Sequence, residues 1–111
     1  AIAHITGGGI FENLERIVPR NFFAEINTEG FSIPEKFLWL KKVGGIESVE
    51  MLKTFNCGIG LILVVKAKES QCVTNFLKKK NINFFILGKI SKKKKKQKTI
   101  LIKKFGKWDL T

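Results

Sequence analysis

The sequence predicts an α/β fold in the α+β sense, with a mixed β-sheet flanked by helices. Two observations support this class. Segments with strand and helix patterns alternate along the 111 residues, and no internal repeat is present. A hydrophobic content of 44% is also that of a folded domain with one core.

The amino-terminal third indicates a strand, a helix and a second strand. Residues 1–6 are an apolar stretch that ends at three glycines and favours an extended conformation. Between Ile10 and Val18 the apolar residues recur with helical spacing, and Pro19 ends the pattern. Residues 22–27 alternate sufficiently to predict a strand.

Two helices are expected in the middle of the chain. Ser32 and Pro34 are typical of a helix start, and Gly44 with Gly45 is typical of a helix end. Ser48 then favours the start of a second, short helix as its N-cap residue.

The carboxy-terminal half predicts three strands around one helix. The Val/Ile/Leu run at 59–66 resembles a strand buried on both faces, 69–80 has the apolar face of a helix, and 82–87 favours a strand. We therefore divide the chain into a domain core at 1–91, a solvated Lys-rich loop at 92–98, and a last strand with a tail at 99–111.

The formal net charge of +12 raises the possibility of a polyanion partner. The positive charge comes almost entirely from lysine, whereas proteins that read nucleic acid depend strongly on arginine. Lysine, asparagine, isoleucine and phenylalanine share AT-rich codons, so nucleotide bias explains much of this charge. The composition therefore argues against nucleic acid as a partner, while an RNA- or polyanion-binding module remains the alternative hypothesis.

The cysteines, the longest apolar run and the first residue give expectations about metal binding, membrane association and chain length. Cys57 and Cys72 are too few for a disulfide framework and lack metal-ligand spacing, so we expect buried thiols in the cytoplasm and no metal site. The apolar run at 59–65 is too short to span a bilayer, so no membrane partner is expected. Because the chain starts at Ala1 without an initiator Met, we expect it to be part of a longer protein.

The glycine run at 7–9 is the feature most suggestive of chemistry. Glycines between a strand and a helix allow positive φ angles and converging amides, which together suit a phosphate group. Thr6 adds a hydroxyl donor. The run matches neither G-x-x-x-x-G-K-[ST] nor G-x-G-x-x-G, and a plain tight turn is the alternative interpretation.

Four segments together resemble aminoimidazole ribonucleotide (AIR) synthetase. Residues 4–19 are similar to its H-[IL]-T-G-G-G-x-x-E-N-[ILV]-x-R-[ILV]-[LV]-P motif, and 34–40 to its P-x-x-F-x-W-L helix. Residues 50–60 resemble E-M-x-x-T-F-N-x-G-[IV]-G, and 87–90 resemble [IL]-G-x-[IV]. Phe31 and Glu15 depart mildly from the family, which often has Trp and Pro there, and the lysine run has no counterpart.

The resemblance implies the carboxy-terminal domain of this purine-biosynthesis ligase, with a three-layer arrangement of sheet and helices. The family uses ATP to close the imidazole ring of formylglycinamidine ribonucleotide. The formyl oxygen is phosphorylated, an amidine nitrogen attacks the activated carbon, and phosphate leaves with ADP as co-product. The resemblance further implies ATP and Mg²⁺ bound mainly by the amino-terminal half, which this chain lacks, and a homodimer for the full-length enzyme.

The resemblance also nominates site residues. His4 is the candidate catalytic residue because a neutral imidazole can transfer a proton or polarise the amide; a packed, hydrogen-bonded histidine is the alternative. Thr6, Gly7, Gly8 and Gly9 are the candidate phosphate cradle.

Further polar residues in the matching motifs leave two interpretations open. For Asn13 and Glu12 the two interpretations are substrate binding and capping of the loop. For Arg16 they are contact with an anion and a surface ion pair. For Thr54 and Asn56 the two interpretations are side chains that face a cleft and side chains that stabilise a turn. A nucleophilic role for Cys57 is not favoured, because no histidine partner is evident. A related ATP-dependent enzyme that acts on selenide or thiamine phosphate is the remaining functional alternative, disfavoured by the 54–60 segment.

Overall fold

A computed structural model of the chain describes residues 1–104, with side chains to Ile102, and confirms the α/β class. The elements follow the chain in this order: β1 (Ile2–His4), α1 (Gly9–Glu15), β2 (Phe22–Asn27), α2 (Glu35–Gly44), α3 (Ser48–Thr54), β3 (Leu61–Leu63), the 3₁₀ turn η1 (Ala67–Glu69), α4 (Ser70–Lys79), β4 (Gly88–Lys92) and β5 (Ile100–Lys104). The predicted tail at 106–111 lies outside the described residues.

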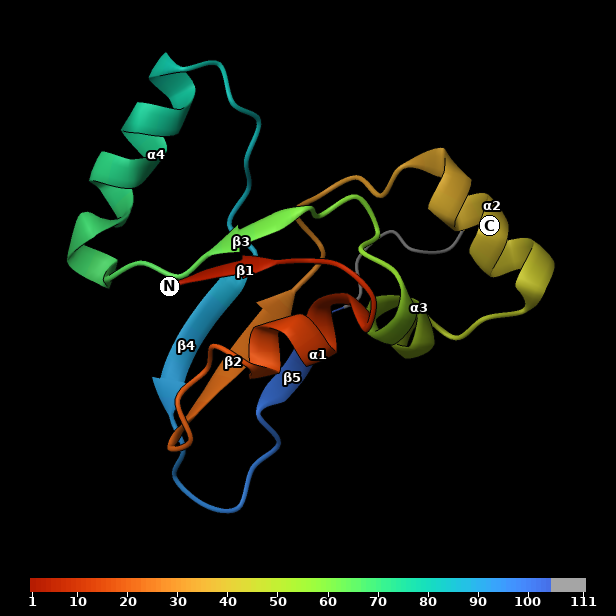
Figure 1. The fold of residues 1–111 in the computed structure, drawn as a ribbon, viewed down its shortest axis with the longest axis horizontal. Coiled ribbons are helices and arrows are strands. Elements are labelled where there is room, and N and C mark those ends of the chain that lie inside the picture. Colours follow the sequence, from red (N-terminus) through yellow and green to blue (C-terminus); the bar gives the residue numbers. More distant parts are fainter. Residues whose placement is uncertain (105–111) are drawn as a thin grey trace.

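The strands form two sheets rather than one. β1 and β3 make an antiparallel pair, in which His4 lies opposite Leu61. The second sheet has the order β4-β2-β5, with β4 antiparallel and β5 parallel to the central β2. This second sheet is mixed, as the sequence predicted, and α1 lies beside the two sheets while α2 and α4 extend to opposite sides (Figure 1).

The core fills the space between α1, α3 and the strands. Ile10 and Leu14 of α1 meet Met51 and Leu52 of α3, and all four are almost completely buried. Inward-facing residues of the strands, such as Ile26, complete the cluster. Burying side chains of this size contributes about 1.5–3 kcal/mol each, so these elements hold one another in place.

Two predicted helices are confirmed with small shifts in their ends. α1 stops at Glu15 rather than at Val18, because residues 16–18 form a turn before Pro19. α2 starts directly after Pro34 and ends where Gly45 adopts a left-handed φ of 61°, as the glycine pair indicated. The N-cap of α3 is Glu47, so the expected capping role of Ser48 was wrong by one position.

The predicted strand at 82–87 is wrong. Pairing with β2 begins where the Asn27 amide donates to the Leu87 carbonyl at 2.8 Å and continues through β4. Residues 82–86 lie beyond the end of β2, where no strand is available to them among residues 1–104. There, Phe85 instead stacks on Phe31 with ring centroids 4.5 Å apart.

The strand expected at 59–66 is shorter and more open than the sequence indicated. Only 61–63 pair as a strand, and Leu61 and Leu63 are 55% and 40% exposed. The run therefore has one covered and one open face within the part of the chain that is described, although its composition is typical of a strand buried on both sides.

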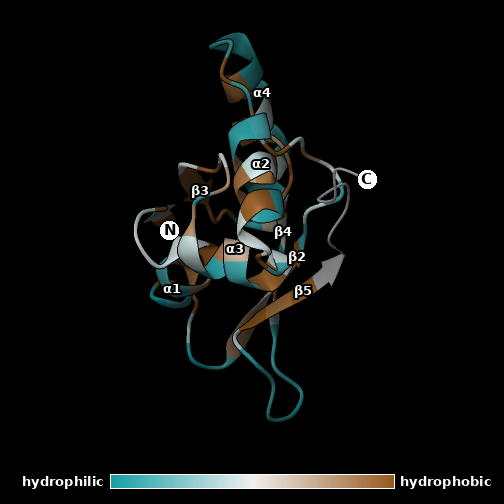
Figure 2. Ribbon diagram, turned by 90° about the vertical axis from the view of Figure 1, so that its right-hand side faces the viewer, coloured by the Kyte–Doolittle hydropathy of each residue, from teal (hydrophilic) through white to brown (hydrophobic). Residues whose placement is uncertain are grey.

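The lysine run joins two strands of the mixed sheet. Lys92 ends β4, and the connection at 93–99 crosses the end of β2 to reach β5. The Lys93 amide donates to the Asn21 carbonyl at 2.8 Å, and the Lys94 amide donates to the Gln97 side chain at 3.2 Å. The loop is strongly hydrophilic, as Figure 2 shows at the bottom of the molecule.

Candidate functional site

The pairing of β1 with β3 brings the candidate site residues together. The Ile5 amide donates to the Gly60 carbonyl at 3.0 Å, so the end of β1 lies beside the start of β3. The glycine loop follows Ile5, and the turn containing Asn56 precedes Gly60. Two motifs far apart in the sequence are thereby placed at the same end of the two-stranded sheet.

The glycine loop is a tight turn packed against α3. The Gly9 amide donates to the Thr6 carbonyl at 3.1 Å, and Gly8 and Gly9 have φ angles of 91° and 62°. A Cβ atom on Gly9 would lie 2.1 Å from the carbonyl oxygen of Leu52. Glycine is therefore required at position 9 by both conformation and contact.

Gly7 has a different role from the other two glycines. Its φ is not in the left-handed region, and a Cβ atom built there would meet no heavy atom within 4 Å among the described residues. Neither conformation nor packing in the described chain therefore requires glycine at position 7. An open backbone position of this kind allows close approach of another molecule.

Asn13 organises the loop from the inside. It is 5% exposed, and its Nδ2 donates to the carbonyls of Thr6, Gly7 and Gly9 at 3.3, 3.2 and 2.7 Å. The Thr6 hydroxyl in turn donates to Asn13 Oδ1 at 3.4 Å. Of the two interpretations left open for this asparagine, the structure supports the one in which its side chain holds the loop.

The direction of these carbonyls determines the direction of the loop amides. In a trans peptide the C=O of one residue and the N–H of the next point in opposite directions, and every described peptide bond is trans. Because the Thr6 and Gly7 carbonyls point inward to Asn13, the amides of Gly7 and Gly8 point outward. Two neighbouring outward amides favour an anion such as phosphate.

Charged side chains of α1 lie beside the loop. Arg16 Nη2 contacts Glu12 Oε1 at 2.7 Å, and both side chains are mostly exposed. Arg16 Nη1 also donates to Asn13 Oδ1 at 3.4 Å. The surface ion pair expected as one alternative for Arg16 is thus present, and its exposure makes it weak enough to rearrange.

His4 and Thr6 share the open face of β1. Side chains alternate along a strand, and the intervening Ala3 and Ile5 are buried while His4 and Thr6 are exposed. The His4 side chain makes no hydrogen bond with any residue in the range 1–104. The imidazole is therefore accessible in the described structure, which gives no support to the packed, hydrogen-bonded alternative.

The turn at 55–59 holds Asn56 in a structural role. Asn56 Oδ1 accepts a hydrogen bond from the Gly58 amide at 2.9 Å, and Cys57 and Gly58 both have positive φ angles. Thr54, at the end of α3, is exposed. The structure therefore supports turn stabilisation by Asn56 and leaves the Thr54 hydroxyl accessible.

Cys57 is a core residue. Its thiol is fully buried, and its Sγ lies 3.5 Å from the Met51 carbonyl. Burial raises the pKa of the Cys57 thiol to about 12, which disfavours the nucleophilic thiolate.

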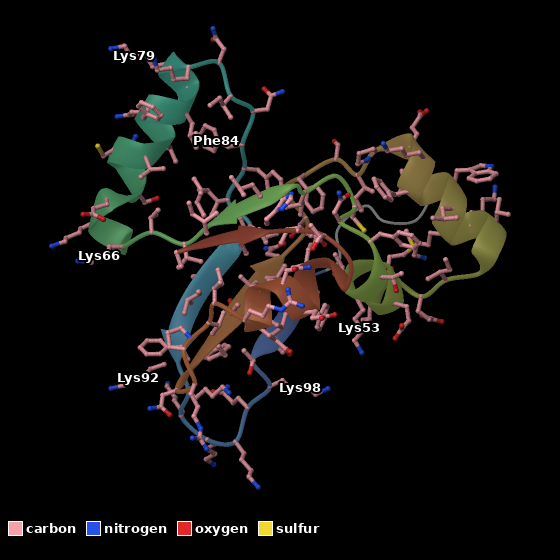
Figure 3. All side chains as sticks on the ribbon, in the orientation of Figure 1. Lys53, Lys66, Lys79, Phe84, Lys92 and Lys98 are labelled. Carbon is pink, nitrogen blue, oxygen red and sulfur yellow. The ribbon has the colours of Figure 1, made fainter. Side chains whose placement is uncertain are left out.

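Lys53 is a neighbour of the site that the sequence did not single out. Its Nζ lies 5.6 Å from the ring centroid of Phe11 on α1 (Figure 3 labels Lys53), and it follows Leu52, whose carbonyl oxygen abuts Gly9. Its place directly before Thr54 in the 50–60 motif was the available signal.

Comparison with known proteins identifies one family and several relatives. The family described as AIR synthase related protein, C-terminal domain, matches residues 1–100. The phosphoribosylformylglycinamidine cyclo-ligase of Neisseria gonorrhoeae is 45% identical over 87 residues, which are 78% of this chain and 25% of that protein. The cyclo-ligase of Neisseria meningitidis is 43% identical over 89 residues, or 80% and 26%. The chain thus spans about a quarter of the length of these relatives.

Proposed function

This chain belongs to the AIR synthase related family, as its C-terminal domain, and from that premise we propose that it forms one wall of a cyclo-ligase active site. The complete enzyme would close the ring of formylglycinamidine ribonucleotide to give aminoimidazole ribonucleotide, with ADP and phosphate as co-products. The observation that carries the proposal is the outward direction of the Gly7 and Gly8 amides, fixed by Asn13.

The loop is suited to bind a phosphate group of the substrate. The Gly7 and Gly8 amides offer two donors, and the open space over Gly7 lets phosphate oxygens reach the backbone. Charge-assisted hydrogen bonds of this kind are about twice as strong as neutral ones. Thr54 and Lys53, on the helix against which Gly9 packs, would add a hydroxyl donor and a positive charge at the rim.

His4 is the residue best placed to handle a proton. Its exposed imidazole shares a face of β1 with Thr6, directly before the loop that would hold the phosphate. A neutral imidazole can accept the proton that an amidine nitrogen loses when it attacks. When bound, ATP supplies the phosphoryl group that turns the formyl oxygen into a leaving group. The work of this chain is then to position the substrate and to move a proton.

The remaining partners follow from the family and from the length of the relatives. ATP and Mg²⁺ would bind mainly to the part of the enzyme that lies outside this chain; among residues 1–104 no group of three His, Cys, Asp or Glu side chains could hold a metal ion. We also propose a homodimer for the complete enzyme and a cytoplasmic location. Within the same residues, no helix is both long and apolar enough to cross a bilayer.

A matched pair of glycine variants tests the phosphate loop. The chain is joined to the amino-terminal three quarters of the gonococcal relative, and ATP-dependent formation of aminoimidazole ribonucleotide is measured. Gly7→Ala places a methyl group where phosphate would approach, whereas Gly30→Ala adds the same methyl group at a second open position, in the connection between β2 and α2. We expect Gly7→Ala to raise KM for the ribonucleotide about tenfold, equivalent to ~1.4 kcal/mol, and Gly30→Ala to leave it unchanged.

The outcome distinguishes the site from a simple turn. Equal kinetics for the two glycine variants would refute phosphate binding by the loop. His4→Asn, with an ordinary KM and a kcat lower by about 10²-fold or more, would support proton transfer. Turnover by this chain alone, without the remainder of the enzyme, would contradict the claim that it supplies only one wall.

The polyanion-binding alternative gains no support from the arrangement of lysines. Figure 3 shows Lys66 and Lys79 at the two ends of α4, and Lys92 and Lys98 at the opposite end of the molecule. No stacking pair of exposed aromatic side chains accompanies them among the described residues. Positive charge divided between two distant parts of the molecule favours solubility over recognition of RNA.

A further inference from the structure

The register of β1 with β3 determines which side chain lies across from His4. The main chains of Ala1 and Val64 exchange two hydrogen bonds of 2.8 Å each, so these residues form a hydrogen-bonded pair. Hydrogen-bonded and non-hydrogen-bonded pairs alternate along an antiparallel ladder, and the pair of His4 and Leu61 lies three steps further on. It is therefore a non-hydrogen-bonded pair, in which side chains approach most closely, with Cβ atoms about 4.5–5.5 Å apart.

The neighbours of His4 on this face of the sheet are apolar. Residues directly opposite each other point to the same side, so Leu61 shares the open face with His4. The next pair on the same face is Ile2 with Leu63. Their exposed fractions are 63% and 40%, and that of Leu61 is 55%, whereas Ala3 on the other face is buried. The imidazole is thus bordered by hydrocarbon across the ladder and on its amino-terminal side.

The polar neighbours of His4 lie on its carboxy-terminal side. Thr6 follows two residues later, its hydroxyl donates to Asn13 Oδ1 at 3.4 Å, and the glycine loop begins directly after it. Both nitrogens of an imidazole need hydrogen-bond partners or water, and hydrocarbon provides neither. A ring turned towards Ile2 or Leu61 would lose contact with water and gain no partner. The apolar side chains therefore favour a ring that points towards Thr6 and the loop.

We infer that Leu61 is a positioning residue, whose side chain holds the imidazole of His4 towards the glycine loop. Leucine has no group that exchanges a proton, so its effect on the reaction acts through His4. Orientation matters because a displacement of a reacting group by about 1 Å can lower a rate by about 10²-fold. The inference rests on the proposed function for the role of His4 in catalysis, but the contact between the two side chains does not depend on it.

NMR of the chain itself tests the orientation. His4 is the only histidine in the sequence, so its imidazole signals are identified without ambiguity. We expect nuclear Overhauser effects from the imidazole to the methyl groups of both Leu61 and Thr6. In Leu61→Ala the effect to Thr6 should fall about threefold or more, because the ring then populates several rotamers. Leu101→Ala is the matched control, since this leucine is 43% exposed on β5 of the other sheet, and it should change nothing.

A kinetic cycle distinguishes positioning from simple packing. In the chain joined to the gonococcal amino-terminal part, we expect Leu61→Ala to lower kcat about tenfold and to leave KM for the ribonucleotide unchanged. Leu61→Met keeps a long apolar side chain and should retain about half of kcat or more. In a His4→Asn background, Leu61→Ala should cause no further loss, because no imidazole remains to be positioned.

Four results would overturn the proposal. These are the absence of an Overhauser effect between the imidazole and Leu61, equal effects of Leu61→Ala and Leu101→Ala, a tenfold loss that persists in the His4→Asn background, and a rise in KM in place of the fall in kcat. If Leu61→Ala does not fold, Leu61→Thr replaces it, because a β-branched residue favours a strand and still lacks the length of leucine. An ordinary kcat for His4→Asn, with the Overhauser effects present, would refute the proposed proton transfer and leave the contact established.

Discussion

The glycine loop and α4 differ in what holds them in place. The loop is held by hydrogen bonds to Asn13 and by the contact of Gly9 with Leu52, all within the chain. α4 has an amphipathic pattern but no buried residue. The contrast shows that local sequence pattern and tertiary support are separate properties: contacts within the described chain hold the first region, whereas few such contacts hold the second.

The two cysteines allow this contrast to be measured without a substitution. Cys57 is buried in the core with its Sγ 3.5 Å from the carbonyl of Met51, next to the Leu52 that contacts Gly9, and burial raises its pKa to about 12, whereas Cys72 is exposed on α4. The thiolate is the reactive form, so a rise from 9.0 to about 12 lowers its population near pH 8 by about 10³. We expect Cys72 to be alkylated at least 10³ times faster than Cys57, as followed by mass spectrometry of tryptic peptides. Similar rates at the two sites would show that the loop region opens as readily as α4.

Gly9→Ala should produce the largest loss of stability. The new Cβ atom would lie 2.1 Å from the Leu52 carbonyl oxygen, and the φ angle of 62° disfavours any L side chain. Main-chain displacement is then unavoidable, and we expect the free energy of unfolding in urea to fall by about 3–5 kcal/mol. Gly30→Ala is the matched control, with an expected change below about 1 kcal/mol. A Gly9→Ala protein as stable as the control would show that the loop is not packed on α3.

Asn13→Ala should have a smaller but clear effect. The substitution leaves three loop carbonyls without the side-chain amide that they now share, at a position that is 5% exposed. We expect a loss of about 2–3 kcal/mol in the free energy of unfolding. In the joined enzyme KM for the ribonucleotide should also rise, since the Gly7 and Gly8 amides lose their fixed direction. Loss of stability with an unchanged KM would separate the packing of the loop from phosphate binding.

Stability should decline with rising pH in the alkaline range because of Cys57. Its pKa in the folded chain is higher than the ordinary 9.0, so the folded state keeps a proton that the unfolded state loses. This contribution is fully present below pH 9 and is lost as the pH rises from 9 towards about 12, at ~1.4 kcal/mol per pH unit. In Cys57→Ser the slope should be lower by that amount, because serine does not ionise there. Identical slopes in the two proteins would place the alkaline transition elsewhere, for example on the lysines.

Leu77→Ala should have the smallest effect on the chain alone. Leu77 is only half-buried, so removing its side chain should cost less than about 1 kcal/mol, against about 3–5 kcal/mol for Leu52→Ala in the core. When the amino-terminal part is present, we expect the cost of Leu77→Ala to rise to that of a buried leucine. A large cost already in the chain alone would mean that α4 is packed in solution, against its exposure in the structure.

The sequence predicted the helices better than the strands. The helix expected at 69–80 is present as Ser70–Lys79 although none of its residues is buried, because helical hydrogen bonds are local and its pattern does not depend on a distant partner. The strand at 22–27, whose inward-facing residues join the core, also lies where it was predicted. The strand expected at 82–87 failed because β2 ends before it could pair. The apolar run at 59–66 has the composition of a doubly covered strand but one open face here. Local pattern alone does not reveal which residues form the opposing surface.

For the site, the sequence identified the residues but not how they act. Asn13 was open to substrate binding or loop capping, and only its contacts with three carbonyls distinguished the two. Gly7, Gly8 and Gly9 were equivalent in the sequence, yet one is open to solvent and another contacts Leu52. These differences depend on the direction of each peptide plane, which a residue pattern does not specify.

The hydrogen bond from Ile5 to Gly60 also affects the time course of folding. It joins strands more than fifty residues apart in sequence, so closing the intervening segment costs chain entropy before any contact compensates for it. Contacts of this kind form late, after local helices such as α1. A nascent or partly unfolded chain would therefore have its glycine turn long before it has a site, and ligand would bind only chains in which the two distant strands have already met.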